Sequence, residues 1–168
     1  MPEDKMTQQE MDSVEDVLIA TLTNEPSEPV LVETFGVVLI FQRPSLVGKF
    51  QGRAWSTKKL KEVGITEEDD PNLSFFFRYW GTLNAYVKQL LVQDKSGDFK
   101  FKGKTYSDYT FDPAKDLGYK SLFEKYVMEE IYEKGISEES FISEVVVLHA
   151  DWINSMAQNV KEDDLKNS

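Results

Sequence analysis

One apolar stripe constrains this sequence more than any other feature. Between residues 73 and 92, large apolar side chains recur at intervals of three and four positions. This spacing places them on one face of an α-helix, and it predicts a central core helix over residues 73–92. The stripe consists of Leu73, Phe76, Phe77, Trp80, Leu83, Val87, Leu90 and Leu91.

Aromatic residues also fall outside that stripe. Phe75, Tyr79 and Tyr86 point towards a second side of the same predicted helix, so its aromatic surface exceeds what one core-facing side requires. Either the helix is buried nearly all round, or part of it contacts a partner. Together with Trp55, these three residues are our candidates for a partner-binding surface. Core packing is the alternative interpretation for each of them.

Two segments carry strand patterns. Residues 30–41 are rich in β-branched and aromatic side chains, and Gly36 marks a bulge or a turn, so they predict a short strand or hairpin. Aromatic and lysine residues alternate from Phe99 to Tyr106, which predicts a second hairpin near residues 99–110 that turns at Gly103.

Helical patterns occupy most of the remaining chain. Leu46, Val47, Phe50 and Ala54 follow helical spacing, and a second short helix is expected over residues 56–63, capped by Ser56. Gly48 and Gly52 interrupt the first of these helices. They indicate either two loosened turns or the close approach of another backbone. Residues 122–131 and 141–156 predict a helical hairpin in the carboxyl half.

The expected fold class is therefore mainly α with a small β element (α+β). In it, the strand or hairpin near residues 30–41 packs on a helical bundle, with the second hairpin near 99–110. We expect three regions: an acidic arm with a Pro-containing linker (1–29), a single globular domain (30–160) and a charged tail (161–168). Within the arm, four residues at helical intervals predict a short amphipathic helix suited to self-association, with a fraying leader as the alternative. They are Met11, Val14, Leu18 and Leu22.

Composition argues against most catalytic chemistry. The 168 residues include no cysteine and one histidine, which excludes thiolate nucleophiles and Cys-based metal sites and makes a Ser-His-Asp triad hard to assemble. The lone His149 is expected to be a partly buried residue satisfied by a neighbour. The acidic connector 66–72 lacks the ligand spacing and the glycine of a calcium loop, so it is interpreted as a solvated loop. We expect no catalytic residue, no metal and no cofactor.

Charge and hydropathy also limit the partners. With 19 Lys and Arg against 30 Asp and Glu, the formal net charge is −11, which disfavours nucleic acid and anionic membranes. The longest apolar run, residues 37–41, is far shorter than the roughly 20 residues of a membrane-spanning helix. The amino terminus lacks the features of a secretion signal. A soluble cytoplasmic protein that binds another protein is expected.

An acidic leader is followed by a β segment that ends in Phe41-Gln42-Arg43-Pro44-Ser45, by a short helical stretch and by the long aromatic helix with Phe75-Phe76-Phe77-Arg78-Tyr79-Trp80. This order of elements resembles the tail assembly chaperones of long-tailed bacteriophages. The resemblance covers residues 30–92. It implies a small, acidic, largely helical protein that coats the hydrophobic tape measure protein in the host cytoplasm before the tail tube polymerises.

The leading hypothesis is therefore a non-enzymatic phage tail assembly chaperone, with the tape measure protein as its partner. A structural tail, baseplate or adaptor component is the first alternative. An acidic inhibitor that mimics nucleic acid is the second, and it requires carboxylates in one continuous stripe, whereas here they cluster at the termini and connectors.

Overall fold

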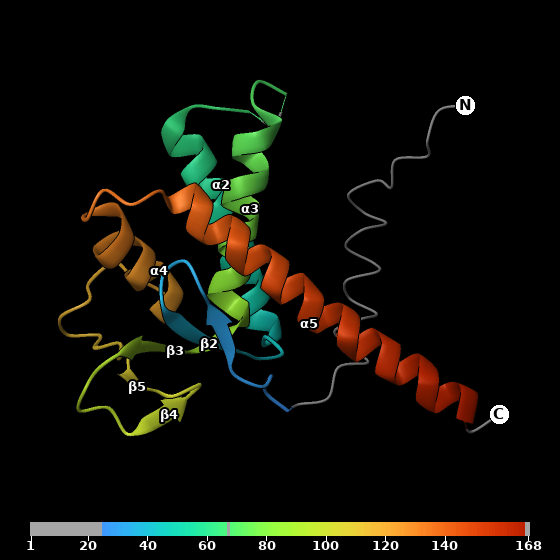
Figure 1. Ribbon diagram of the computed structural model, residues 1–168. Coiled ribbons are helices and arrows are strands. Elements are labelled where there is room, and N and C mark those ends of the chain that lie inside the picture. Colours follow the sequence, from blue (N-terminus) through green and yellow to red (C-terminus); the bar gives the residue numbers. More distant parts are fainter. Residues whose placement is uncertain (1–24, 67, 167–168) are drawn as a thin grey trace.

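The computed structural model describes residues 25–66 and 68–166 (Figure 1). A curled, five-stranded antiparallel sheet forms a half-barrel, with one hairpin at each edge and the third strand of the chain between them. Helices supply the rest of the core. The predicted arm helix, with Met11, Val14, Leu18 and Leu22, lies outside the described residues.

The first hairpin is formed by β1 (Val30–Val32) and β2 (Val37–Phe41). Gly36 lies in the turn between them with a φ of 66°, a conformation that glycine adopts at little cost, so the turn is the correct one of the two predicted alternatives. The chain before β1 is held to the end of β2, because Ser27 exchanges two hydrogen bonds of 2.8 Å with the backbone of Phe41.

Helices α2 (Leu46–Val63) and α3 (Pro71–Tyr86) form an antiparallel pair. The two short helices predicted over residues 46–63 are one continuous helix. Ser56 is not an N-cap, since its hydroxyl donates to the Phe77 carbonyl of α3 at 2.8 Å. Gly52 and Gly81 meet where the helices cross, and a Cβ on Gly52 would lie 2.3 Å from the Gly81 carbonyl oxygen. Close approach of a backbone is therefore the correct interpretation of Gly52.

The helix predicted over residues 73–92 ends early. α3 stops at Tyr86 and the chain continues without a loop as β3 (Val87–Gln93), which pairs with β2 and β5. Val87 and Leu90 pack against the helices, whereas Leu91 faces the other side of the sheet. A strand with apolar residues on both faces shows no alternation. This is why the segment also satisfied the helical pattern.

The second hairpin consists of β4 (Phe99–Phe101) and β5 (Lys104–Asp108), and Lys102 and Gly103 form its turn with positive φ angles of 46° and 79°. Because β3 joins this hairpin to the first, both belong to one sheet. The predicted fold class, mainly α with a small β element, is therefore wrong. The protein is α+β with 50% helix and a full five-stranded sheet.

The carboxyl half contains α4 (Leu122–Tyr126), the π-helical turn η1 (Val127–Tyr132) and α5 (Glu138–Lys166). Figure 1 shows α5 crossing α3 and running out beyond the sheet. It continues into residues 161–166, which belong to the predicted charged tail. Within the described part of the chain, no helix combines the length and apolar character that crossing a bilayer requires.

Candidate functional site

Trp55, the first predicted partner-binding residue, lies in the core. It is buried, and its ring packs 4.7 Å from that of Trp80, between α2 and α3. Its indole Nε1 donates a 2.8 Å hydrogen bond to Oε1 of Glu124 on α4, whose side chain is also buried. Trp55 therefore connects α2 to α4 and offers no surface to a partner.

Tyr86, another predicted contact residue, is also buried. Its ring lies 4.4 Å from the ring of His149, which in turn contacts Phe41 at 5.1 Å. His149 is enclosed by aromatic rings, and its Nε2 has no hydrogen-bond partner among the described residues, contrary to the expectation of a satisfied histidine. Burial lowers the pKa of His149 to about 4, so the imidazole is neutral near pH 7.

Phe75 and Tyr79 are the two predicted contact residues that the structure leaves at the surface. They lie one helical turn apart on α3, with ring centroids 4.3 Å apart. Phe75 is 55% exposed and Tyr79 is half-buried. We call these two residues the aromatic pair. It presents adjoining rings on a helix whose other side packs against α2.

A second apolar surface lies on α2. Leu46, Val47 and Phe50, whose helical spacing predicted this helix, are 68%, 65% and 55% exposed. The packed face is instead formed by Gly52, Trp55 and Ser56. The spacing of Gly48, Gly52 and Ser56 was the signal for it, because small residues at intervals of four let another helix approach.

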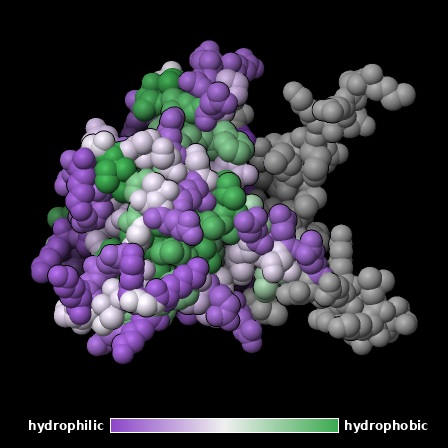
Figure 2. All heavy atoms as spheres, in the orientation of Figure 1, coloured by the Kyte–Doolittle hydropathy of each residue, from purple (hydrophilic) through white to green (hydrophobic). Residues whose placement is uncertain are grey.

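Exposed apolar side chains are not confined to α2. Figure 2 shows hydrophobic residues at the surface near the outer end of the α2–α3 pair, surrounded by hydrophilic ones. Val63 at the end of α2 is exposed, as are Leu117 and Val147. Single exposed apolar residues are ordinary on soluble proteins, whereas adjoining ones are typical of contact surfaces.

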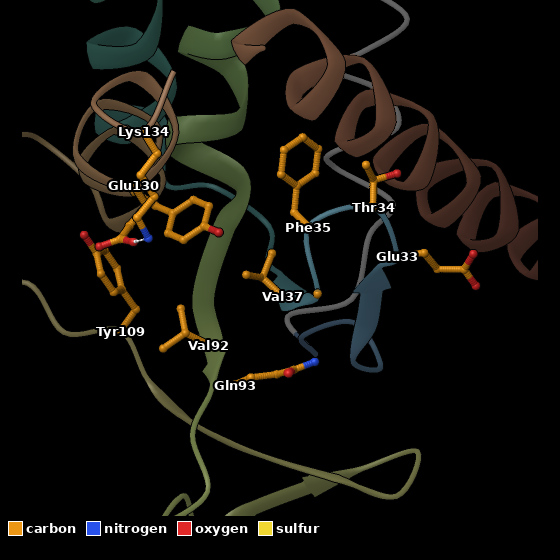
Figure 3. Close-up of a pocket in the computed structure, with 11 residues that line it drawn as sticks. Glu33, Thr34, Phe35, Val37, Val92, Gln93, Tyr109, Glu130 and Lys134 are labelled. Atoms are coloured by element: carbon orange, nitrogen blue, oxygen red, sulfur yellow. Dashed lines mark hydrogen bonds and ion pairs between the residues drawn. The ribbon is translucent and has the colours of Figure 1, made fainter. Parts of the chain in front are cut away.

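A cavity of about 570 Å³ lies between the first hairpin, the end of β3 and η1 (Figure 3). Sequence reasoning did not find it, because its walls come from segments far apart in the chain. Figure 3 shows Tyr109, Glu130 and Lys134 on one side of the cavity, opposite Thr34 and Phe35. The lining residues are Glu33, Thr34, Phe35, Gly36, Val37, Val92, Gln93, Tyr109, Tyr126, Glu130 and Lys134.

Hydrogen bonds and ion pairs already engage the polar groups of this cavity. The Tyr109 hydroxyl donates to Oε2 of Glu129 at 2.9 Å, and Lys134 forms an ion pair with Glu130. Burial and the bond to Glu129 raise the pKa of Tyr109 above its usual range. Burial and the charge of Glu130 raise the pKa of Tyr126 to about 12. Both phenols therefore remain protonated near pH 7, and neither supplies a phenolate base.

The described residues contain no group of three or more His, Asp or Glu side chains placed to hold a metal ion. No family model, no curated protein and no solved structure matches this chain.

Proposed function

We propose that this protein is a non-enzymatic phage tail assembly chaperone that binds and solubilises the tape measure protein in the host cytoplasm. The observation that carries the proposal is the aromatic pair. Phe75 and Tyr79 were expected to contact a partner, and they remain at the surface side by side. Adjoining aromatic rings on a helix provide an anchor for the apolar face of a partner helix.

The scaffold beneath the pair supports this role. α3 is held against α2 by the Gly52–Gly81 contact and by the hydrogen bond from Ser56 to Phe77. The rings are therefore presented in a fixed arrangement, which reduces the entropy lost on binding. The net charge of −11 favours solubility of a complex with a hydrophobic protein.

The distribution of charge favours this proposal over a mimic of nucleic acid. α2 carries Lys49, Arg53, Lys58, Lys59 and Lys61 but a single acidic residue, Glu62. An acidic mimic of nucleic acid requires a continuous acidic surface, and the basic residues of α2 interrupt such a surface.

Co-expression with a tape measure protein tests the proposal. We expect the natural chain to increase the soluble fraction of the tape measure protein and to co-purify with it. The double variant Phe75→Ser/Tyr79→Ser should lose at least about tenfold in recovered complex. Leu117→Ser/Val147→Ser is the matched control, since it removes two exposed apolar residues elsewhere and should leave recovery unchanged.

Two results would overturn the proposal. One is recovery of no complex by the natural chain, and the other is equal recovery by both double variants. Mass spectrometry of purified virions addresses the structural alternative. A chaperone is absent from the finished particle, whereas a tail or baseplate component is found there.

A further inference from the structure

The outward face of α2 differs from the rest of this acidic protein. Its first half is apolar and exposed, with Leu46, Val47 and Phe50. Its second half is basic, with Lys58 and Lys61 on the same side of the helix. We call this face the α2 stripe. It consists of Leu46, Val47, Phe50, Arg53, Ala54, Thr57, Lys58 and Lys61.

The segment that precedes the described residues carries the complementary pattern. Residues 1–24 contain six acidic residues and one lysine, and all seven lie within the first 16 positions. The stretch 17–22, Val-Leu-Ile-Ala-Thr-Leu, is mostly apolar and uncharged. In residues 1–24, the acidic half therefore comes first and the apolar half second. In α2, the apolar half comes first and the basic half second.

The point at which this segment joins the fold determines which halves meet. Ser27 is held to Phe41 by its backbone N–H and by its side-chain oxygen, both at 2.8 Å, and Ser45 caps the start of α2 shortly afterwards in the chain. The described chain therefore begins beside the strand that leads into α2. If the preceding residues ran antiparallel to α2, the apolar stretch 17–22 would face Leu46 and Phe50, and the acidic stretch would reach Lys58 and Lys61.

The lengths agree with this arrangement. The 18 residues of α2 span about 27 Å at 1.5 Å per residue. Residues 3–22 in helical form span about 30 Å. Residues 23–27 bridge up to about 17 Å when extended, which is enough to cross from the anchored Ser27 to the face of α2.

We infer that residues 3–22 dock antiparallel on the α2 stripe of the same chain, with their apolar half on Leu46, Val47 and Phe50 and their acidic half over Lys58 and Lys61. The contact covers apolar surface that is otherwise exposed to water. It also brings opposite charges together, so it weakens as salt shortens the Debye length from roughly 30 Å at 0.01 M to 3 Å at 1 M. The inference does not rest on the proposed function, because the aromatic pair lies on a different helix.

Zero-length cross-linking of the purified full chain, followed by mass spectrometry, tests the inference without any partner. A carbodiimide joins a carboxylate to a lysine only when the two are in contact. We expect links from Glu10, Asp12, Glu15 or Asp16 to Lys58 or Lys61, and we expect their yield to fall several-fold between low and high salt. Absence of these links at low salt overturns the inference.

A variant pair separates docking from chance encounters. Leu46→Glu/Phe50→Glu places two charges on the apolar half and leaves both target lysines intact, so the link yield should fall at least about tenfold. Leu117→Glu/Val147→Glu adds the same charge elsewhere and should retain the yield. Both positions in α2 are exposed, so the fold is expected to survive, and circular dichroism checks this. Equal yields in the two variants overturn the inference.

The same experiment distinguishes docking within one chain from docking on a second copy. In an equal mixture of isotopically light and heavy protein, contacts within one chain produce only light–light and heavy–heavy links. If mixed links account for about half of the product, the arm docks on a second copy and the intrachain inference is wrong.

Discussion

Trp55 and Glu124 are joined by a hydrogen bond of 2.8 Å between the indole Nε1 and Oε1 of the carboxylate, and both side chains are buried. The second carboxylate oxygen accepts from the backbone N–H of Lys120 at 3.2 Å. A carboxylate is thus held inside the protein by neutral donors, and this bond links helices α2 and α4.

Trp55→Phe removes the indole donor and leaves Oε1 of Glu124 buried without it. We expect the free energy of unfolding to fall by about 2–4 kcal/mol, from the lost hydrogen bond and the smaller ring. Glu124→Gln retains an acceptor oxygen and should cost less. Urea denaturation of the three proteins measures the differences, and a loss below about 0.5 kcal/mol for Trp55→Phe would contradict this account.

The close contact between Gly52 and Gly81 predicts that one methyl group added at Gly81 will destabilise the fold. A Cβ on Gly81 would lie 2.1 Å from the Ser56 hydroxyl oxygen and 2.4 Å from the Gly52 carbonyl oxygen. Gly81→Ala should therefore destabilise the protein by roughly 1–3 kcal/mol, although alanine is the better helix former by about 1 kcal/mol. Gly48→Ala is the control, because a Cβ there would meet only side-chain atoms, 3.1 Å from the Ser45 Oγ and 4.0 Å from the Ala85 Cβ. Equal melting temperatures for both variants would refute the prediction.

His149 predicts how stability depends on pH. Unfolded His149 takes up a proton below its ordinary pKa of 6.5, whereas the folded residue does so only below about 4. Between these values the unfolded state binds more protons, so the free energy of unfolding falls as the pH drops from about 6.5 to about 4. The full effect is up to roughly 3 kcal/mol. His149→Phe should flatten this part of the stability curve, measured by urea denaturation at several pH values.

We expect the hydrogen bond of Tyr109, in the wall of the cavity, to contribute less to the free energy of unfolding than the Trp55–Glu124 bond does. Tyr109→Phe removes the hydrogen bond to Glu129 but keeps the ring beneath the ammonium group of Lys125, which lies 4.8 Å from the ring centroid. We expect a loss of about 1 kcal/mol in thermal or urea unfolding. Glu129→Gln preserves an acceptor oxygen for the Tyr109 hydroxyl, so it should lower the free energy of unfolding by less than Tyr109→Phe does. A larger loss for Glu129→Gln would show that the hydrogen bond is not the source of the effect.

Local signals in the sequence predicted local structure well. The turn at Gly36, the hairpin around Gly103 and the end of α2 at Gly64 all follow from glycine and from β-branched or alternating residues. The β3 strand was missed because Val87, Leu90 and Leu91 satisfy both helical and strand spacing. Only pairing with β2 and β5 decides between the two, and pairing is not visible in a single segment.

The candidate site was predicted less well, because exposure is a property of the whole fold. Trp55 and Phe75 were both predicted to contact a partner, yet one is buried against Trp80 and the other is exposed. Leu46 and Phe50 follow the spacing of an apolar helix face, yet both are exposed. Here the crossing of two helices at glycine turns the opposite side of α2 inward. The cavity depends on four separate segments of the chain and had no local signal.

The direct passage from α3 into β3 has a mechanical consequence. Tyr86 ends the helix and Val87 begins the central strand of the sheet, so no flexible residues separate the aromatic pair from the middle of the half-barrel. The position of Phe75 and Tyr79 is therefore set by the backbone ladder of the sheet through a continuous length of α3. A partner helix of the proposed kind would have to fit its own shape to rings whose place relative to the sheet is fixed.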